Sequence, residues 1–202
     1  MDIEMVGTLF SYLLALLLLC CLASFGWGMC RFFTRPDRMT LGMKVTAVLG
    51  GSFAFLHLWA ILAADDISVP ACSIAASLCV SACGLFWWAV GANWKRPLPV
   101  CFSPNRCLHL NRRGPYRFVR HPFYCSCLLA CFTGVVATGN LWLVPTALVM
   151  LAIYASAARR EEEHFACGPL ADDYREYRNH TGQFSLILGS YGLEPAHLHC
   201  GQ

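Results

Sequence analysis

Five apolar stretches separated by polar connectors constrain this chain more than any other feature of its sequence. A helix needs roughly 20 consecutive apolar residues to cross a bilayer, and four of the five stretches have about that length. The chain is also 57% hydrophobic and only 13% charged, whereas an average soluble domain carries about 25% charged residues. We therefore predict an all-α, polytopic membrane protein with about five transmembrane helices. The stretches are 6–29, 45–64, 71–94, 123–137 and 141–158.

The last two stretches are expected to form a helical hairpin. They are joined by Thr138-Gly139-Asn140, a sequence typical of a tight turn. The first arm has about fifteen residues, so we expect it to tilt little or to thin the bilayer. A charged helix, 159–177, should follow outside the membrane, with Gly168-Pro169 as a potential break.

The distribution of basic residues predicts the orientation in the membrane. The connector 31–44 is basic, the connector 65–66 is acidic, and the loop 95–119 carries six Lys or Arg and no acidic residue. Cytoplasmic loops carry an excess of Lys and Arg. This alternation predicts an N-terminus outside and a cytosolic C-terminus.

Charge and histidine placement narrow the function classes. The net charge is +3 without a dense basic cluster, so nothing in the sequence indicates nucleic acid as a partner. The 13 cysteines contain no tetrad at zinc-ligand spacing, and no metal site is expected. His57 lies inside the second apolar stretch, where a titratable residue is a functional candidate by default. No acid or second histidine stands one turn away, so we favour an interhelical hydrogen bond for it.

The segment from Gly114 to Tyr124 concentrates the polar residues of the long loop directly before an apolar helix. Pro122 suits the first helical position, because its missing N–H would lack an intrahelical partner there. His121 should therefore lie at the preceding turn, beside backbone N–H groups that attract a carboxylate. The alternative is that the arginines and tyrosines of this segment only anchor a transmembrane helix at the interface.

An ordered set of motifs in this half of the chain resembles the catalytic region of the isoprenylcysteine carboxyl methyltransferases. The resemblance covers about 109–188, less than half of the chain, and its Arg-His-Pro-x-Tyr core also occurs in membrane phospholipid methyltransferases. One departure is Cys125-Ser126, where family members usually carry a glycine. The matching pieces are His109-Leu110, Gly114-Pro115-Tyr116-Arg117, Arg120-His121-Pro122-Phe123-Tyr124, Arg159, Glu161-Glu162-Glu163, Tyr174-Arg175-Glu176-Tyr177 and Thr181-Gly182.

The resemblance implies a membrane-embedded enzyme that uses S-adenosyl-L-methionine and methylates the C-terminal carboxylate of isoprenylated cysteine in proteins. The chain is expected to form one membrane-embedded domain, 1–202, with three transmembrane helices in 1–94, and the methyltransferase region is assigned to 95–190. The expected partners are a prenylated protein C-terminus or a lipid substrate, together with membrane lipids. The expected location in a eukaryote is the endoplasmic reticulum membrane.

The resemblance also assigns roles to individual residues. Arg159 would face the substrate carboxylate, and Arg120 is the second predicted catalytic residue. Glu163 is assigned to the cofactor because it alone of the three acids follows Arg159 by four residues, although Glu162 fits an alignment made backwards from Tyr174. The remaining residues implied for cofactor binding are Leu108, His109, Leu110, Asn111, Tyr116, His121, Pro122, Phe123 and Tyr124.

Two other functions remain open at this point. The first is methylation of a phospholipid such as phosphatidylethanolamine, or of another small amphiphile. The second is a non-catalytic membrane protein that retains the fold. The intact Arg120-His121-Pro122-x-Tyr124 motif and the Arg159/Glu163 pair argue against the second, while His109 and the Thr181-Gly182 ending favour carboxyl methylation over phospholipid methylation.

Overall fold

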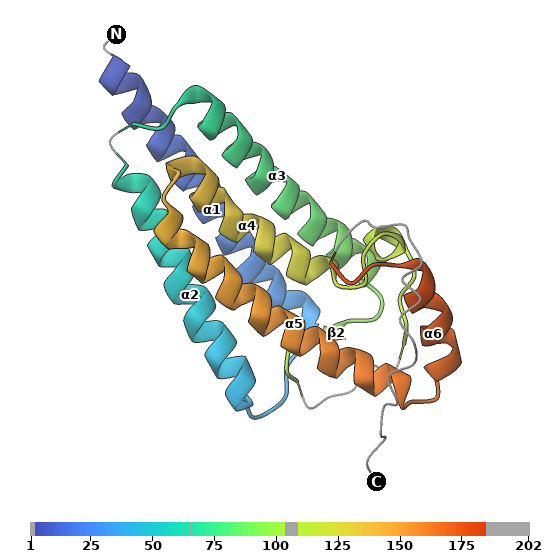
Figure 1. Cartoon of the computed structure of the whole chain (residues 1–202). Coiled ribbons are helices and arrows are strands. Elements are labelled where there is room, and N and C mark those ends of the chain that lie inside the picture. The colour runs from blue at the N-terminus through green and yellow to red at the C-terminus, as the bar shows by residue number, and fades with distance from the viewer. Residues whose placement is uncertain (1–2, 65, 104–108, 185–202) are drawn as a thin grey trace.

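A computed structural model describes residues 3–64, 66–103 and 109–184, and these residues are almost entirely helical (Figure 1). The predicted all-α fold is therefore confirmed. Leu108, assigned to the cofactor by resemblance, lies outside the described residues. The helices are α1 (Ile3–Phe32), α2 (Leu41–Leu62), α3 (Val69–Ala92), α4 (Pro122–Thr138), α5 (Val144–Ala166) and α6 (Ala171–His180), with short 3-10 turns at Gly114–Arg117 and Leu141–Leu143 and two-residue strands β1 (Phe33–Thr34) and β2 (Leu98–Pro99).

Four of the described helices are long and apolar enough to span a membrane, namely α1, α2, α3 and α5 with the preceding 3-10 turn. The fifth apolar helix, α4, has 17 residues, which corresponds to about 25 Å of helix. It ends at Gly139, whose φ of 62° places it in the left-handed region that favours glycine. The side chain of Asn140 then accepts a hydrogen bond from the Trp142 backbone N–H at 3.0 Å. The predicted hairpin between α4 and α5 is thus present.

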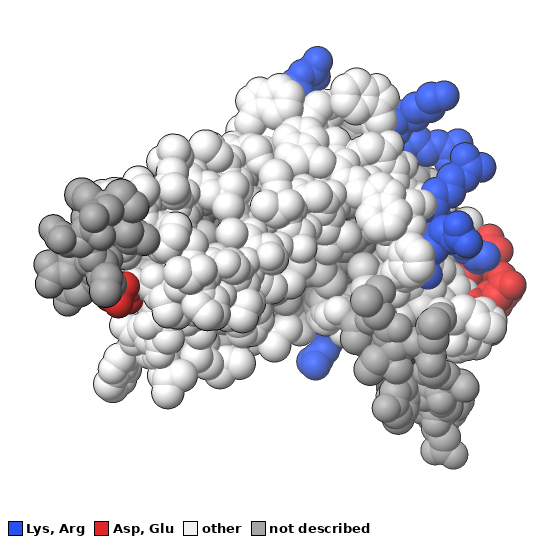
Figure 2. All heavy atoms as spheres, turned by 90° about the horizontal axis from the view of Figure 1, so that it is seen from above, with Lys and Arg blue, Asp and Glu red and all other residues white. Residues whose placement is uncertain are grey.

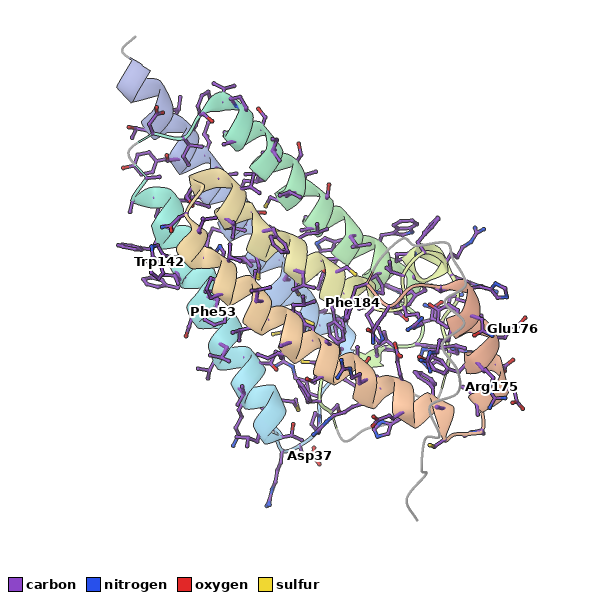
Figure 3. All side chains as sticks on the ribbon, viewed as in Figure 1. Asp37, Phe53, Trp142, Arg175, Glu176 and Phe184 are labelled. Carbon is purple, nitrogen blue, oxygen red and sulfur yellow. The ribbon has the colours of Figure 1, made fainter. Side chains whose placement is uncertain are left out.

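The five apolar helices lie side by side, so that their connections gather at two opposite ends (Figure 1). One end, here called the polar end, holds the connector 33–40, the described parts of the loop 93–121, and α6 with the C-terminal part of α5. The other end holds the Gly139 turn and the connector near Asp66, which approaches Gly7 of α1. Asp37 and Trp142 mark the two ends in Figure 3. Most of the visible Lys and Arg side chains cluster near the polar end in Figure 2, as the charge alternation predicts.

The short helix α4 lies in the middle of the bundle, where it packs against α1, α2, α3 and α5. Its buried face is built largely from small side chains, including Ser126, Ala130, Thr133 and Gly134. Small residues let helix backbones approach closely within a membrane. The short helix α4 is therefore surrounded by the four longer apolar helices.

His57 joins three of these helices. Its Nε2 atom lies 2.8 Å from the Thr146 hydroxyl, and the His57 side chain is only 2% exposed. The interhelical hydrogen bond expected from the sequence is therefore confirmed. The imidazole also lies directly against α4 at Gly134, where an added Cβ would come within 2.3 Å of His57 Nδ1.

We expect Gly134→Ala to destabilise the protein by about 1–3 kcal/mol, because the new methyl group overpacks the contact with His57. Thermal unfolding in detergent measures the effect. Gly84→Ala on α3 is the matched control, since nothing lies within 4 Å of a Cβ at that position. Equal stability of the two variants would contradict the close packing of His57 on α4.

Candidate active site

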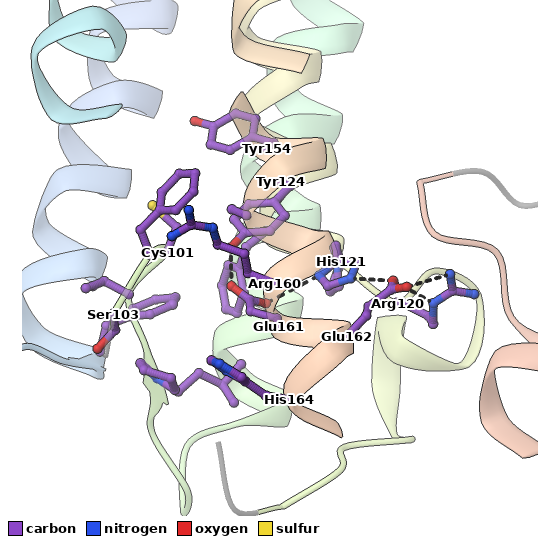
Figure 4. Close-up of a pocket in the computed structure, with 18 of the residues that line it drawn as sticks. Cys101, Ser103, Arg120, His121, Tyr124, Tyr154, Arg160, Glu161, Glu162 and His164 are labelled. Atoms are coloured by element: carbon purple, nitrogen blue, oxygen red, sulfur yellow. Dashed lines mark hydrogen bonds and ion pairs between the residues drawn. The ribbon is translucent and has the colours of Figure 1, made fainter. Parts of the chain in front are cut away.

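A cavity of about 850 Å³ opens at the polar end of the bundle (Figure 4), and its size falls within the roughly 300–1,000 Å³ typical of small-molecule sites. One part of its wall is apolar and comes from the transmembrane helices. The other part is polar and comes from the loop 93–121, the charged end of α5, and α6. The apolar lining includes Phe25, Met29, Phe86, Phe123, Cys127 and Tyr154, and the polar lining includes His109, Asn111, Arg120, His121, Glu161, Glu162, Glu163 and His164.

A partly buried ion network around Glu162 forms the polar floor of this cavity. Arg120 Nε donates to Glu162 Oε1 at 3.0 Å, and the ring nitrogen Nε2 of His121 lies 3.0 Å from the same oxygen. The Arg120 side chain is 10% exposed and that of Glu162 is 14% exposed. Because α5 continues without a break from the apolar span to Ala166, the last turns of this helix carry Glu162 onto the start of α4. Charge-assisted hydrogen bonds of this kind are among the strongest in proteins.

Glu161 occupies a different environment from its neighbour. The Tyr124 hydroxyl donates to Glu161 Oε1, and His121 Nδ1 lies 3.6 Å from Oε2. His121 thus stands between two carboxylates. The Tyr124 ring stacks on His121 at 5.4 Å and on Tyr154 at 5.0 Å, so a column of aromatic rings leads from the ion network towards the apolar part of the cavity.

The segment 181–184 closes the ion network from the C-terminal side. The Arg120 guanidinium donates to the Thr181 carbonyl, and the Arg120 backbone N–H donates to the Gly182 carbonyl at 2.9 Å. Gln183 Nε2 adds a hydrogen bond to Glu162 Oε1 at 3.2 Å. The centroid of the Phe184 ring lies 5.9 Å from that of the His121 ring. Figure 3 shows Phe184 beside the start of α4. The Arg-His-Pro motif and the Thr-Gly pair therefore bind each other directly.

The loop side of the cavity is fixed by a second set of hydrogen bonds. Asn93, which caps the end of α3, donates to the Tyr116 hydroxyl at 2.9 Å and accepts from Asn111 Nδ2 at 3.0 Å. The Tyr177 hydroxyl of α6 donates to the Tyr116 carbonyl at 2.7 Å. These contacts attach the motif segment to both α3 and α6.

The structure brings most of the sequence-predicted site residues to one cavity. Arg159 is the exception among the described ones: it is exposed and is not among the cavity-lining residues. Glu163 lines the cavity but is exposed to solvent, whereas Glu162 is engaged by Arg120, His121 and Gln183. The functional roles assigned to all of these residues remain predictions. The predicted residues that line the cavity are His109, Leu110, Asn111, Tyr116, Arg120, His121, Pro122, Phe123, Tyr124 and Glu163.

Several lining residues were not identified from the sequence. Phe25 and Met29 of α1 and Phe86 of α3 line the apolar part, and they belong to stretches without any recognisable motif. Phe102 and Arg160 line the cavity as well. Arg160 directly follows Arg159, the residue that was assigned from the sequence. Sequence spacing does not show which of two neighbouring residues on a helix faces a cavity.

His121 is poised to carry a positive charge. Burial alone lowers the pKa of the ring, because it disfavours the charged form. Hydrogen bonds and negative charge from Glu161 and Glu162 outweigh this effect and hold the pKa of His121 above its ordinary value. The protonated ring is therefore the form that the site stabilises.

This raised pKa predicts a specific pH dependence of stability. The contribution of His121 is fully present below the ordinary histidine pKa of about 6.5 and is lost as the pH rises through the higher folded-state pKa. Thermal unfolding from about pH 6 to about pH 9 should therefore show a steeper loss of stability for the wild type than for His121→Gln. Parallel profiles for the two proteins would show that His121 is not held in its charged form.

Comparison with known protein families identifies one match. The model of the phospholipid methyltransferase family matches residues 72–167, which include most of α3, all of α4 and α5, the Arg120–Tyr124 motif and the three glutamates. No curated protein and no solved structure matches the chain. Residues 72–167 of the chain are therefore similar to the phospholipid methyltransferase family, a family of membrane S-adenosylmethionine-dependent methyltransferases related to the isoprenylcysteine methyltransferases.

Proposed function

We propose that this membrane methyltransferase transfers a methyl group from S-adenosylmethionine to the C-terminal carboxylate of an isoprenylated cysteine. The observation that carries the proposal is a single cavity with an apolar wall of transmembrane side chains and a polar wall of ionisable ones. A lipid tail fits the first wall and a polar cofactor fits the second. The motif resemblance to the carboxyl methyltransferases supports the choice of acceptor.

The chemistry of the polar wall suits the cofactor. Aromatic rings line the cavity, and aromatic faces attract a sulfonium, while the first turn of α4 favours a carboxylate. Glu162 is already engaged by Arg120, His121 and Gln183, so we assign it a positioning role. Glu163 lines the same cavity and forms no ion pair with the residues that the structure describes, which leaves its carboxylate available to the cofactor.

The contribution of the protein to the reaction is alignment and exclusion of water. S-adenosylmethionine, when bound, supplies an electrophilic methyl group. A carboxylate acceptor is ionised at neutral pH, so it requires no general base. The surrounding residues need only hold the acceptor in line and remove its water, and fixing such a geometry can lower a barrier by about 7–11 kcal/mol at best. The apolar walls at Phe86, Phe123 and Tyr154 are suited to exclude water.

We infer that the polar end faces the cytosol. The basic connectors of the chain lie at this end, as expected for a cytoplasmic surface. The cofactor would enter from the cytosol, and the lipid would enter sideways between the helices. In a eukaryotic cell the endoplasmic reticulum membrane is the proposed location.

A second candidate acceptor is the amine of phosphatidylethanolamine. The match to the phospholipid methyltransferase family favours it, and so does the acidic lining of the cavity at Glu161 and Glu163. An ammonium group must lose a proton before it can accept a methyl group. Glu161, which already accepts a hydrogen bond from Tyr124, is the carboxylate best placed for that step.

A methylation assay with labelled S-adenosylmethionine tests the proposal on purified protein in detergent, with a farnesylcysteine analogue and phosphatidylethanolamine offered side by side. We expect a base-labile methyl ester on the farnesylcysteine analogue. Glu163→Gln should weaken cofactor binding by about 10- to 100-fold, as expected for loss of a hydrogen bond to a charged group, and should leave thermal stability unchanged. Glu162→Gln should lower both the affinity for the cofactor and the thermal stability.

Label on the phosphatidylethanolamine amine alone would assign the second acceptor. Absence of label on both lipids, in a sample that remains folded, would contradict methyl transfer to these acceptors. Unchanged cofactor affinity in Glu163→Gln, measured by calorimetry, would remove that residue from the cofactor site.

A further inference from the structure

We propose that Arg160, held in place by Phe102, binds an anionic group of the acceptor lipid at the opening of the cavity. The inference rests on the proposed function and adds a specific recognition residue to it. It concerns residues that the motif resemblance does not assign. The resemblance assigns the substrate carboxylate to Arg159, which does not line the cavity, whereas Arg160 does.

Arg160 is the cavity arginine whose charge is not already used by a carboxylate. The described arginines that line the cavity are Arg120 and Arg160, and Arg120 is paired with Glu162. No carboxylate of the described residues lies within ion-pair distance of Arg160. Its guanidinium instead lies over the Phe102 ring, 5.5 Å from the ring centroid. Such a guanidinium retains its hydrogen-bond donors for a ligand.

Phe102 is held in an unusual conformation to provide this support. Its φ of 57° lies in the left-handed region, where a bulky residue is an outlier. The Thr40 hydroxyl, which also caps the start of α2, donates to the Phe102 carbonyl at 3.0 Å. Gly42 makes room for the ring, because a Cβ there would come within 2.8 Å of Phe102 Cγ. Strained residues of this kind tend to occur at ligand sites.

The N-terminal helices hold the segment that carries Phe102. β1, directly after α1, pairs in parallel with β2, and the Val100 backbone N–H donates to the Thr34 carbonyl at 3.2 Å. The α1–α2 connector lies outside the region that matches the methyltransferase family. The placement of Arg160 therefore depends on a part of the chain that the family match does not cover.

The position of Arg160 favours the acceptor over the cofactor as its ligand. In Figure 4 the Arg160 side chain extends from α5 towards Cys101, on the side of the cavity away from Arg120 and Glu162. Tyr124 and Tyr154 lie on the way to the apolar part of the cavity. A lipid whose tail lies against this apolar wall would present its head group to Arg160. The guanidinium binds carboxylates and phosphates alike through paired hydrogen bonds, so both groups are candidates.

Binding of small anionic amphiphiles tests this site independently of catalysis. The probes are octanoate for a carboxylate, octyl phosphate for a phosphate, and octylamine as the cationic control, each titrated into the purified full-length chain in maltoside detergent. We expect Arg160→Gln to weaken one or both anionic probes by about 10- to 100-fold and to leave octylamine and S-adenosylmethionine unchanged. Arg175→Gln removes the same charge from the exposed face of α6 and is the matched control. The anion that loses affinity identifies the source of the group.

A variant of Phe102 tests the contact between its ring and Arg160 without a loss of overall stability. Phe102→Asn removes the ring but tolerates the left-handed conformation, so the protein should be at least as stable to heat as the wild type. We expect its affinity for the anionic probe to fall by about two- to fivefold, as for loss of a partly exposed cation–π contact. Phe102→Tyr keeps an aromatic face, so this variant should bind the anionic probe with the affinity of the wild type.

Three results would overturn the proposal. The first is unchanged affinity for both anionic probes in Arg160→Gln. The second is a loss of S-adenosylmethionine affinity in that variant, which would assign the guanidinium to the carboxylate of the cofactor. The third is a loss of anion binding in Arg159→Gln but not in Arg160→Gln. Failure of the wild type to methylate either lipid acceptor, with anion binding at Arg160 intact, would count against the proposed function and not against this site.

Discussion

The partly buried contact between Glu162 and the Arg120–His121 pair is the interaction on which the polar end depends. It joins segments separated by some 40 residues, namely the turn before α4 and the C-terminal part of α5. Through Gln183 and the Thr181 and Gly182 carbonyls, the same contact also fixes the chain after α6. Removing one partner of a fully buried pair typically costs about 3–5 kcal/mol, and this partly buried network is expected to lie below that range. The cavity therefore owes its polar floor to one network.

The position of this network explains why the cavity has two chemical halves. α5 runs from the membrane span into the ion network as one helix, and α4 begins at the network and runs back through the middle of the bundle. Side chains near the start of α4 therefore face either the ions or the apolar core. Tyr124 serves both, with its hydroxyl on Glu161 and its ring stacked on Tyr154. The proposed methyl donor and lipid acceptor would meet at this boundary.

Much of the architecture could be predicted from the sequence, because helix length, apolar runs and turn signals are local properties. The five apolar helices, the Gly139 turn, the interruption near Gly168 and the hydrogen bond of His57 were all expected and are present. The position of each side chain around α5 was harder to predict. A shift of one residue rotates a side chain by about 100° around a helix, so spacing alone did not distinguish Arg159 from Arg160 or Glu162 from Glu163.

Contacts between distant segments were also beyond the reach of sequence patterns. Phe102 carries no motif, and its conformation depends on Thr40 and Gly42 in another connector. The contribution of Phe25 and Met29 to the apolar lining depends on how α1 packs, which its uniformly apolar sequence does not reveal. The pairing of Arg120 with Thr181 and Gly182 likewise appears only when the chain is folded.

A double-mutant cycle between Arg120 and Glu162 tests the central claim most directly. The free energy of unfolding would be measured in mixed micelles for Arg120→Gln, Glu162→Gln and the double variant. If the network is the interaction that holds the polar end together, each single change should be strongly destabilising, and the coupling energy should be about 1–3 kcal/mol. Additive effects, with a coupling energy near zero, would show that Arg120 and Glu162 stabilise the protein independently and would contradict this account.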